Sequence, residues 1–199
     1  MLNGWRVTGW AALAIGLMIA VILATEGVGE SGIHLTIRST AQTSFALFLS
    51  AFVASPLLKL WPNATTRWLR ANRRYMGVSF AVSHVCHALA ILGLAVLTSG
   101  ASLKESGAVA IVGGSIVYGV ILAMAATSFD RTERWIGQRA WKRLHTTGMF
   151  LLWTIFALAY VPRAFSSILY LPFALAMLGA MALRIAARTR RPLHKTASA

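Results

Sequence analysis

Hydrophobic residues gather in six long runs along this chain, and each run is apolar on every face. The runs cover residues 8–25, 40–61, 75–98, 108–128, 141–161 and 166–188. Each is close to the ~20 residues with which a helix crosses a ~30 Å hydrocarbon core. A membrane strand needs only ~10 residues of alternating polarity, so a barrel is excluded. The pattern therefore predicts an all-α integral membrane protein, a bundle of six transmembrane helices.

Composition supports this class. Of the 199 residues, 57% are hydrophobic and 12% are charged, with a mean hydropathy of +0.67. A soluble domain is about a quarter charged. We interpret residues 1–199 as one transmembrane domain that ends in a basic tail at 189–199. No glycine motif lies between a strand and a helix, so any flavin or nicotinamide chemistry has to come from a partner protein.

Positive charge is concentrated on one side of the predicted membrane. If the odd-numbered helices run outward, that side holds all but three of the 19 lysines and arginines. The other three are Arg38, Lys104 and Arg163. Because cytoplasmic loops carry an excess of Lys and Arg, both termini are predicted to be cytoplasmic. This topology explains the net charge of +14. Membrane lipid is therefore the expected contact, and nucleic acid is not an expected partner.

Two histidines share one face of the third predicted helix, in "RRYMGVSFAVSHVCHALAI" (residues 73–91). At 100° per residue, His84 and His87 fall on the side that also carries Gly77, Phe80 and Ala88. Polar side chains inside a bilayer usually face the bundle interior and mark a site. The candidate uses are haem ligation, metal binding, a proton relay and hydrogen bonding between helices. The spans contain no Asp or Glu, which weighs against a dedicated metal site and against cation transport.

A third histidine, His145, stands near the start of the fifth predicted helix, in "RAWKRLHTTGMF". His87 lies 13 residues beyond Arg74, whereas His145 lies 3 beyond Lys142. If both helices leave the same membrane surface together, the two histidines differ in depth by about ten residues, or ~15 Å. We therefore do not expect His87 and His145 to bind one iron.

Three stretches resemble the ferric reductase-like transmembrane family, closest to the haem-binding membrane subunits of the periplasmic methionine-sulfoxide reductase system. They are "RSTAQTSFALFLSAFVASPLLKL", "RRYMGVSFAVSHVCH" and "ILAMAATSFDRTERWIGQRAWKRLHTTGMF", which lie within residues 38–161. The last stretch is the most specific, because it joins a helix ending in Thr-Ser to a Trp, a basic pair and Leu-His.

The resemblance implies that haem b, one or two per chain, is bound by His87 and His145, with His84 as an additional ligand candidate. Arg73 and Arg74 are then expected beside the haem propionates. It also implies an electron-transfer subunit of an oxidoreductase system in the bacterial inner (cytoplasmic) membrane. Electrons would come from a cytoplasmic flavin reductase and leave to a redox partner at the outer face.

The chain departs from the family at one ligand position. A further haem histidine of the family falls on Leu158, which stands between Ala157 and Ala159. This departure keeps an alternative open: a membrane scaffold or assembly subunit of a larger complex that has lost some or all of its haem.

Overall fold

The computed structural model describes residues 2–190 and is almost entirely helical. Its elements are α1 (Trp5–Glu26), α2 (Glu30–Leu60), α3 (Ala64–Leu97), α4 (Ala101–Ala126), α5 (Asp130–Ile136), α6 (Gln138–Ser166), the short 3-10 helix η1 (Ile168–Tyr170) and α7 (Leu171–Thr189). Residues 2–190 contain no strand. Six helices are long and apolar enough to cross a membrane: α1, α2, α3, α4, α6, and α7 with η1. This confirms the all-helical architecture that the apolar runs predict. Most of the tail predicted at 189–199 lies outside the described residues.

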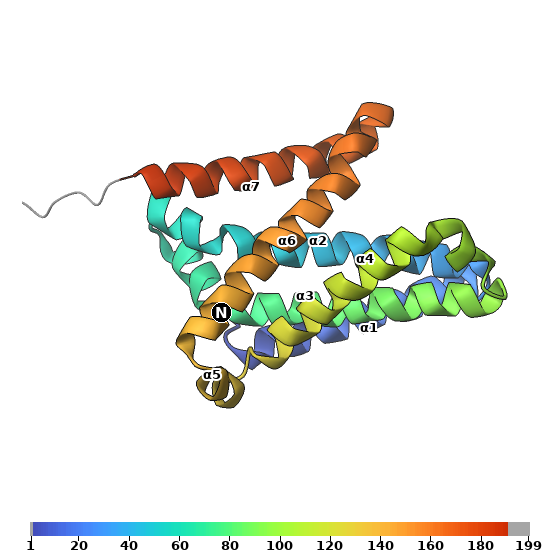
Figure 1. The fold of residues 1–199 in the computed structure, drawn as a ribbon, viewed down its shortest axis with the longest axis horizontal. Coiled ribbons are helices and arrows are strands. Elements are labelled where there is room, and N and C mark those ends of the chain that lie inside the picture. The colour runs from blue at the N-terminus through green and yellow to red at the C-terminus, as the bar shows by residue number, and fades with distance from the viewer. Residues whose placement is uncertain (1, 191–199) are drawn as a thin grey trace, which may run out of the picture.

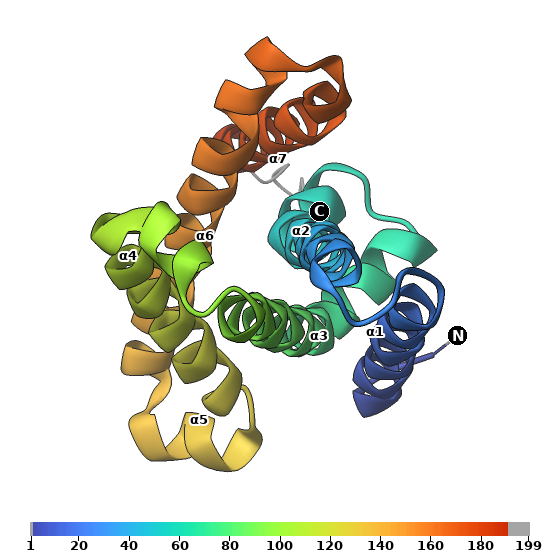
Figure 2. The same ribbon diagram turned by 90° about the vertical axis from the view of Figure 1, so that its right-hand side faces the viewer.

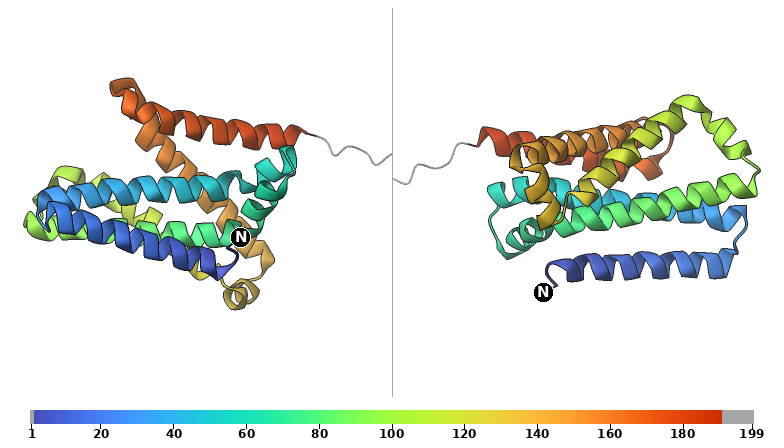
Figure 3. Two further views of the ribbon diagram at one scale, coloured as in Figure 1. Left: turned by 180° about the vertical axis from the view of Figure 1, so that it is seen from behind. Right: turned by 60° about the horizontal axis from the view of Figure 1, so that its bottom comes forward.

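The helices α1, α2, α3 and α7 run back and forth along one axis, and α6 crosses them obliquely (Figure 1). The pair α2 and α3 forms the most extensive contact, and α1 packs against both. Seen along the axis, α4 and α6 lie across from this group, while α7 packs on α2 and α6 (Figure 2). One end of the bundle carries the start of α1, the α2–α3 connection, α5 and the end of α7 (Figure 3). We call it the basic end, because most of the cations stand on these segments.

Two helices, α2 and α3, begin furthest ahead of the apolar runs that predict them. α2 starts at Glu30 and not near residue 40, so most of the outer connection expected at 25–40 is helical. Its polar residues do not end the helix, because Thr36 and Thr40 are buried and donate to the carbonyls of Gly32 (2.8 Å) and Thr36 (2.7 Å). α3 starts at Ala64 with a capping box, in which Asn63 and Thr66 exchange hydrogen bonds of 2.9 and 3.0 Å.

Pro56 lies inside α2 and leaves one backbone carbonyl of this helix without its helical donor. Proline has no N–H, so the carbonyl of Phe52, four residues earlier, has no helical donor. Arg184 of α7 donates to that oxygen at 3.0 Å, and its guanidinium lies 4.4 Å from the centre of the Phe52 ring. Arg73 of α3 donates to the adjacent carbonyl of Ala51 at 3.1 Å. These two cations therefore join α3 and α7 to the proline-containing part of α2.

Asn72 fixes the beginning of α1 to α3. Its side chain is 1% exposed; Oδ1 accepts from the Gly4 N–H at 2.9 Å, and Nδ2 donates to Asn3 Oδ1 and to the Trp68 carbonyl, both at 3.0 Å.

We expect Asn72→Leu to lower the free energy of unfolding by about 1–3 kcal/mol, because buried partners lose their hydrogen bonds. Denaturation in mixed micelles measures the change. Gln42→Leu, at an exposed position of α2, should cost less than about 0.5 kcal/mol. Equal losses in the two variants would contradict the assignment.

Candidate functional site

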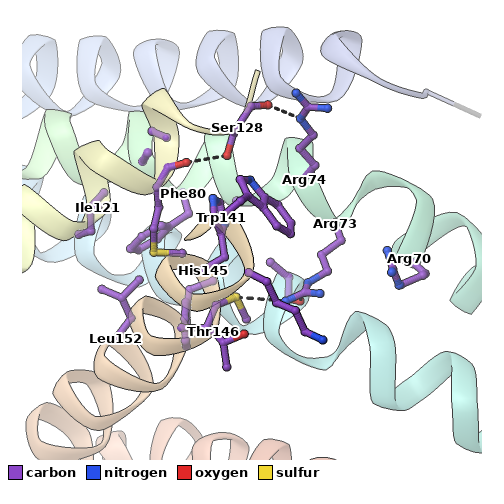
Figure 4. Close-up of a pocket in the computed structure, with 18 of the residues that line it drawn as sticks. Arg70, Arg73, Arg74, Phe80, Ile121, Ser128, Trp141, His145, Thr146 and Leu152 are labelled. Atoms are coloured by element: carbon purple, nitrogen blue, oxygen red, sulfur yellow. Dashed lines mark hydrogen bonds between the residues drawn. The ribbon is translucent and has the colours of Figure 1, made fainter. Parts of the chain in front are cut away.

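A cavity of about 370 Å³ opens between α2, α3, α4, α6 and α7 near the basic end (Figure 4). Its polar lining is rich in cations: Arg70, Arg73, Arg74, Lys142 and Arg184, with His145, Trp141, Ser128 and Thr146. Apolar residues complete it, among them Phe48, Phe80, Ile121 and Leu152. Figure 4 shows the three arginines of α3 gathered at one end and Ile121 and Leu152 at the other. No carboxylate belongs to the described lining.

The ring of His145 is fixed by the end of α4 and by its own helix. Nε2 lies 3.1 Å from Thr127 Oγ1, and that hydroxyl donates to the Ala123 carbonyl at 2.7 Å. Because the threonine proton is already used, Nε2–H is the donor, and Nδ1 carries the imidazole lone pair. Trp141 stacks on the ring with centroids 4.3 Å apart and donates from Nε1 to the Thr127 carbonyl at 2.9 Å. The imidazole therefore stands at a defined place in the cavity wall.

The double arginine of α3 holds neighbouring elements together. Besides its bond to Ala51, Arg73 donates to Ser55 Oγ and to the Met149 sulfur, both at 3.4 Å. Arg74 donates to the Ser128 carbonyl and forms an ion pair with Asp130, at the turn between α4 and α5. Both predicted propionate partners line the cavity, and both already bond protein acceptors there.

The ion pair at Asp130 makes stability depend on pH. The hydrogen bond and the charge of Arg74 lower the pKa of this exposed carboxyl below its ordinary value. A carboxyl whose pKa is lower in the folded state stabilises the fold above its unfolded pKa, and this contribution is lost as the pH falls through the folded value. We expect Asp130→Asn to lower the melting temperature slightly at pH 7 and to have no effect well below pH ~4. Melting curves in detergent across this range measure it, and a deficit that persists in acid would contradict it.

His84 and His87 lie together on α3, with ring centroids 5.3 Å apart. Nδ1 of His87 lies 3.0 Å from the Ile37 carbonyl and 3.2 Å from Thr40 Oγ1, whose proton goes to Thr36. Nδ1 is therefore protonated and Nε2 keeps its lone pair, which is how a metal-binding histidine is commonly oriented. Nδ1 of His84 is buried without a hydrogen-bond partner, as is the hydroxyl of Tyr118, whose ring lies 5.0 Å away.

The structure does not bring His145 together with the pair on α3. Thr127 and Ser128, adjacent on the chain, contact His145 and Arg74 respectively, so these two lie at a similar level. His87 is 13 residues further along α3, which corresponds to about 20 Å of helix rise. The cavity includes Gly77 and Phe80 of α3 but neither His84 nor His87. His87 and His145 are therefore too far apart to be the two axial ligands of one iron.

Leu158 lies on the outward face of α6 and is 66% exposed. Its neighbours Phe156 and Tyr160 point inward instead, with ring centroids 5.7 and 5.1 Å from that of Phe45. A side chain at position 158 therefore does not reach the bundle interior, which aromatic rings fill at this depth. Among residues 2–190, no group of three or more His, Cys, Asp or Glu side chains is placed to hold a metal ion.

Sequence reasoning missed Arg184, which lines the cavity from α7. The charge pattern places Arg184 only among the cations of one predicted side of the membrane. A signal was present, because Pro56 within an apolar run leaves a buried carbonyl that needs a donor from elsewhere. Comparisons with protein-family models, with curated proteins and with solved structures found no match to this chain.

Proposed function

We propose that this chain is a membrane subunit that binds b-type haem in the cavity beside His145 and carries electrons within the bilayer. The observation that carries the proposal is the cavity itself: apolar walls, one imidazole and five cations, with no carboxylate in its described lining. Haem needs an axial imidazole, room for a flat apolar ring, and donors for its propionates.

The residues present fit the cofactor in three respects. His145 would supply the axial nitrogen, the cations of α3 and α7 would receive the propionates, and Ile121 and Leu152 would contact the apolar edge. Gly77 borders the cavity on α3, and no heavy atom outside the backbone of its own helix lies within 4 Å of where its Cβ would be. Binding through Nε2 would replace the hydrogen bond to Thr127, a cost of about 0.5–1.5 kcal/mol. When bound, haem supplies reversible one-electron chemistry.

The resemblance to the ferric reductase-like family supports the same function. Under this proposal the basic end is cytoplasmic, as the positive-inside rule predicts, and the membrane is the bacterial inner membrane. A cytoplasmic flavin reductase would donate electrons at this end. A redox partner at the opposite face would accept the electrons. His84 and His87, the latter with an unprotonated Nε2, lie between the cavity and that face.

A second function, a haem-free scaffold or assembly subunit, is favoured by one observation. The outer half of the bundle is packed with the rings of Phe45, Phe156 and Tyr160, and Leu158 points away from it. The scaffold function does not explain the cavity, because a protein whose helices serve only for packing needs no open space beside His145.

Haem titration into the purified chain separates the two functions. We expect saturable binding of one haem per chain, with a Soret band and quenching of the fluorescence of Trp141, which lines the cavity. Trp141→Phe should remove part of the quenching and leave a Soret band. Titration without saturation, or with equal quenching in Trp141→Phe, would contradict haem binding at this place and favour the scaffold.

A further inference from the structure

A second, open groove of about 370 Å³ lies on the outer side of α6 at the basic end. It is lined by Arg139, Lys142, Arg143, Thr146 and Thr147, all of them exposed. The residues follow one another at helical spacing over the first turns of α6, so that their side chains form one stripe. The stripe offers three cations and two hydroxyls, and no carboxylate lines the groove.

These cations differ from four other arginines of the basic end. Arg73, Arg74, Arg184 and Arg190 each donate to a backbone carbonyl of the protein. Within residues 2–190, the cations of the groove form no ion pair; the ion pair present joins Arg74 to Asp130. Nothing in the described fold accounts for their placement, whereas each of the other four satisfies a particular oxygen.

The two threonines are also available to a ligand. Hydroxyls inside helices commonly donate to the carbonyl four residues earlier. Thr127 and Thr154 do so in this chain, at 2.7 and 3.0 Å. No such bond is formed by Thr146 or Thr147 with the described residues. Their hydroxyl protons can therefore be donated to an oxygen that enters the groove.

The same face of α6 continues beyond the groove with Phe150, which packs on the Phe52 ring, and then with the exposed side chains of Thr154 and Leu158. Phe150, Thr154 and Leu158 fall within about 60° of Arg143 around the helix. Thr154 and Leu158 are exposed, Leu158 by 66%. A ligand that matches this face of α6 is thus anionic at the groove and apolar near Leu158, a few helical turns away. That combination describes a phospholipid and not the surface of an acidic soluble protein.

We infer that this groove binds the phosphate of an anionic phospholipid, with the acyl chains lying along the apolar continuation of α6 through Leu158. Arg139, Lys142 and Arg143 would neutralise the phosphate, and the threonine hydroxyls would donate to its oxygens. Lys142 and Thr146 also line the cavity, whereas Arg139, Arg143 and Thr147 line the groove without lining the cavity, so the inference does not depend on haem. It also gives the outward position of Leu158 a role as part of a lipid-contacting surface.

Native mass spectrometry of the full chain in detergent tests this, with dioleoylphosphatidylglycerol or dioleoylphosphatidylcholine added as the probe. We expect the anionic dioleoylphosphatidylglycerol to bind more tightly than the zwitterionic dioleoylphosphatidylcholine. Arg139→Gln/Arg143→Gln should weaken the binding of dioleoylphosphatidylglycerol by at least about tenfold, because each cation near an anionic headgroup raises the affinity roughly fivefold. The control, Arg131→Gln/Arg134→Gln, removes equal charge from exposed positions of α5 at the same end. It should change the affinity less than about twofold.

Three results would overturn the inference. Equal losses in the test and control variants would mean that only net charge matters. Equal affinity for the two lipids would mean that the groove does not recognise the anionic headgroup. Displacement of the lipid by equimolar glycerophosphoglycerol, the soluble headgroup without acyl chains, would assign the groove to a free phosphate ester. Thr146→Val/Thr147→Val should weaken lipid binding by a smaller factor than Arg139→Gln/Arg143→Gln. An unchanged affinity in the threonine variant would show that the two hydroxyls do not contact the phosphate.

Discussion

His145→Ala should abolish haem binding while leaving the helical fold intact. We expect the purified variant to contain at least about tenfold less haem than the wild type, because metal affinity falls 10–100-fold even when only an outer-shell partner is lost. The side chain is partly exposed at the cavity wall, and its one hydrogen-bond partner, Thr127, also bonds its own helix. Removing the ring therefore costs little stability. The pyridine haemochrome assay on protein of matched concentration measures the loss.

Two matched variants make this result specific. Thr127→Val removes the hydrogen bond to Nε2, together with the bond from the threonine hydroxyl to the Ala123 carbonyl within α4. It should keep or raise the haem content, since the imidazole is then free to bind iron. His87→Ala should keep the haem in the cavity, because His87 does not line it. Added imidazole should restore a Soret band to His145→Ala. If His87→Ala lost the haem and His145→Ala kept it, the cavity would not be the haem site.

Phe52→Ala should destabilise the protein more than any other single truncation of a core aromatic residue. The side chain is 0% exposed and lies between Phe48, at 5.5 Å, and Phe150, at 6.2 Å, with the Arg184 guanidinium 4.4 Å above its ring. Truncation of a fully buried Phe costs about 3–5 kcal/mol. It also removes the ring that positions Arg184, which lines the cavity, so a weaker affinity for haem should accompany the loss.

Phe165→Ala provides the control for this prediction. Phe165 stands near the end of α6 and is 89% exposed, so its truncation should change the free energy of unfolding by less than about 0.5 kcal/mol. Unfolding in mixed micelles, followed by circular dichroism, compares the two. A loss below about 1.5 kcal/mol for Phe52→Ala would show that α2, α6 and α7 do not pack around this ring as described.

The six candidate spans could be predicted because each is a long apolar run. Length and apolar composition located all six candidate spans, and helical periodicity placed His84 and His87 on one face, where their rings now stack. The early start of α2 could not be predicted in this way. It depends on Thr36 and Thr40 being buried against neighbouring helices, where their hydroxyls find partners in the helix itself.

The candidate site was only partly accessible from sequence. The position of His145 after a basic cluster marked it as a candidate, but the cavity depends on how five helices pack. Arg184 enters it from α7 and stands 111 residues beyond Arg73 in the sequence, and no local pattern predicts that these side chains meet. The outward direction of Leu158 could have been foreseen. A separation of 13 residues turns a straight helix by about 220° relative to His145, so the two positions face different ways.

The dithionite-reduced minus air-oxidised difference spectrum of the wild-type chain tests the central claim most directly. It should be recorded on protein expressed with haem precursor and purified in detergent. We expect a b-type α band and a Soret band, equivalent to one haem per chain by pyridine haemochrome. A colourless protein with no difference spectrum, in spite of adequate haem supply, would contradict haem binding and leave the scaffold function.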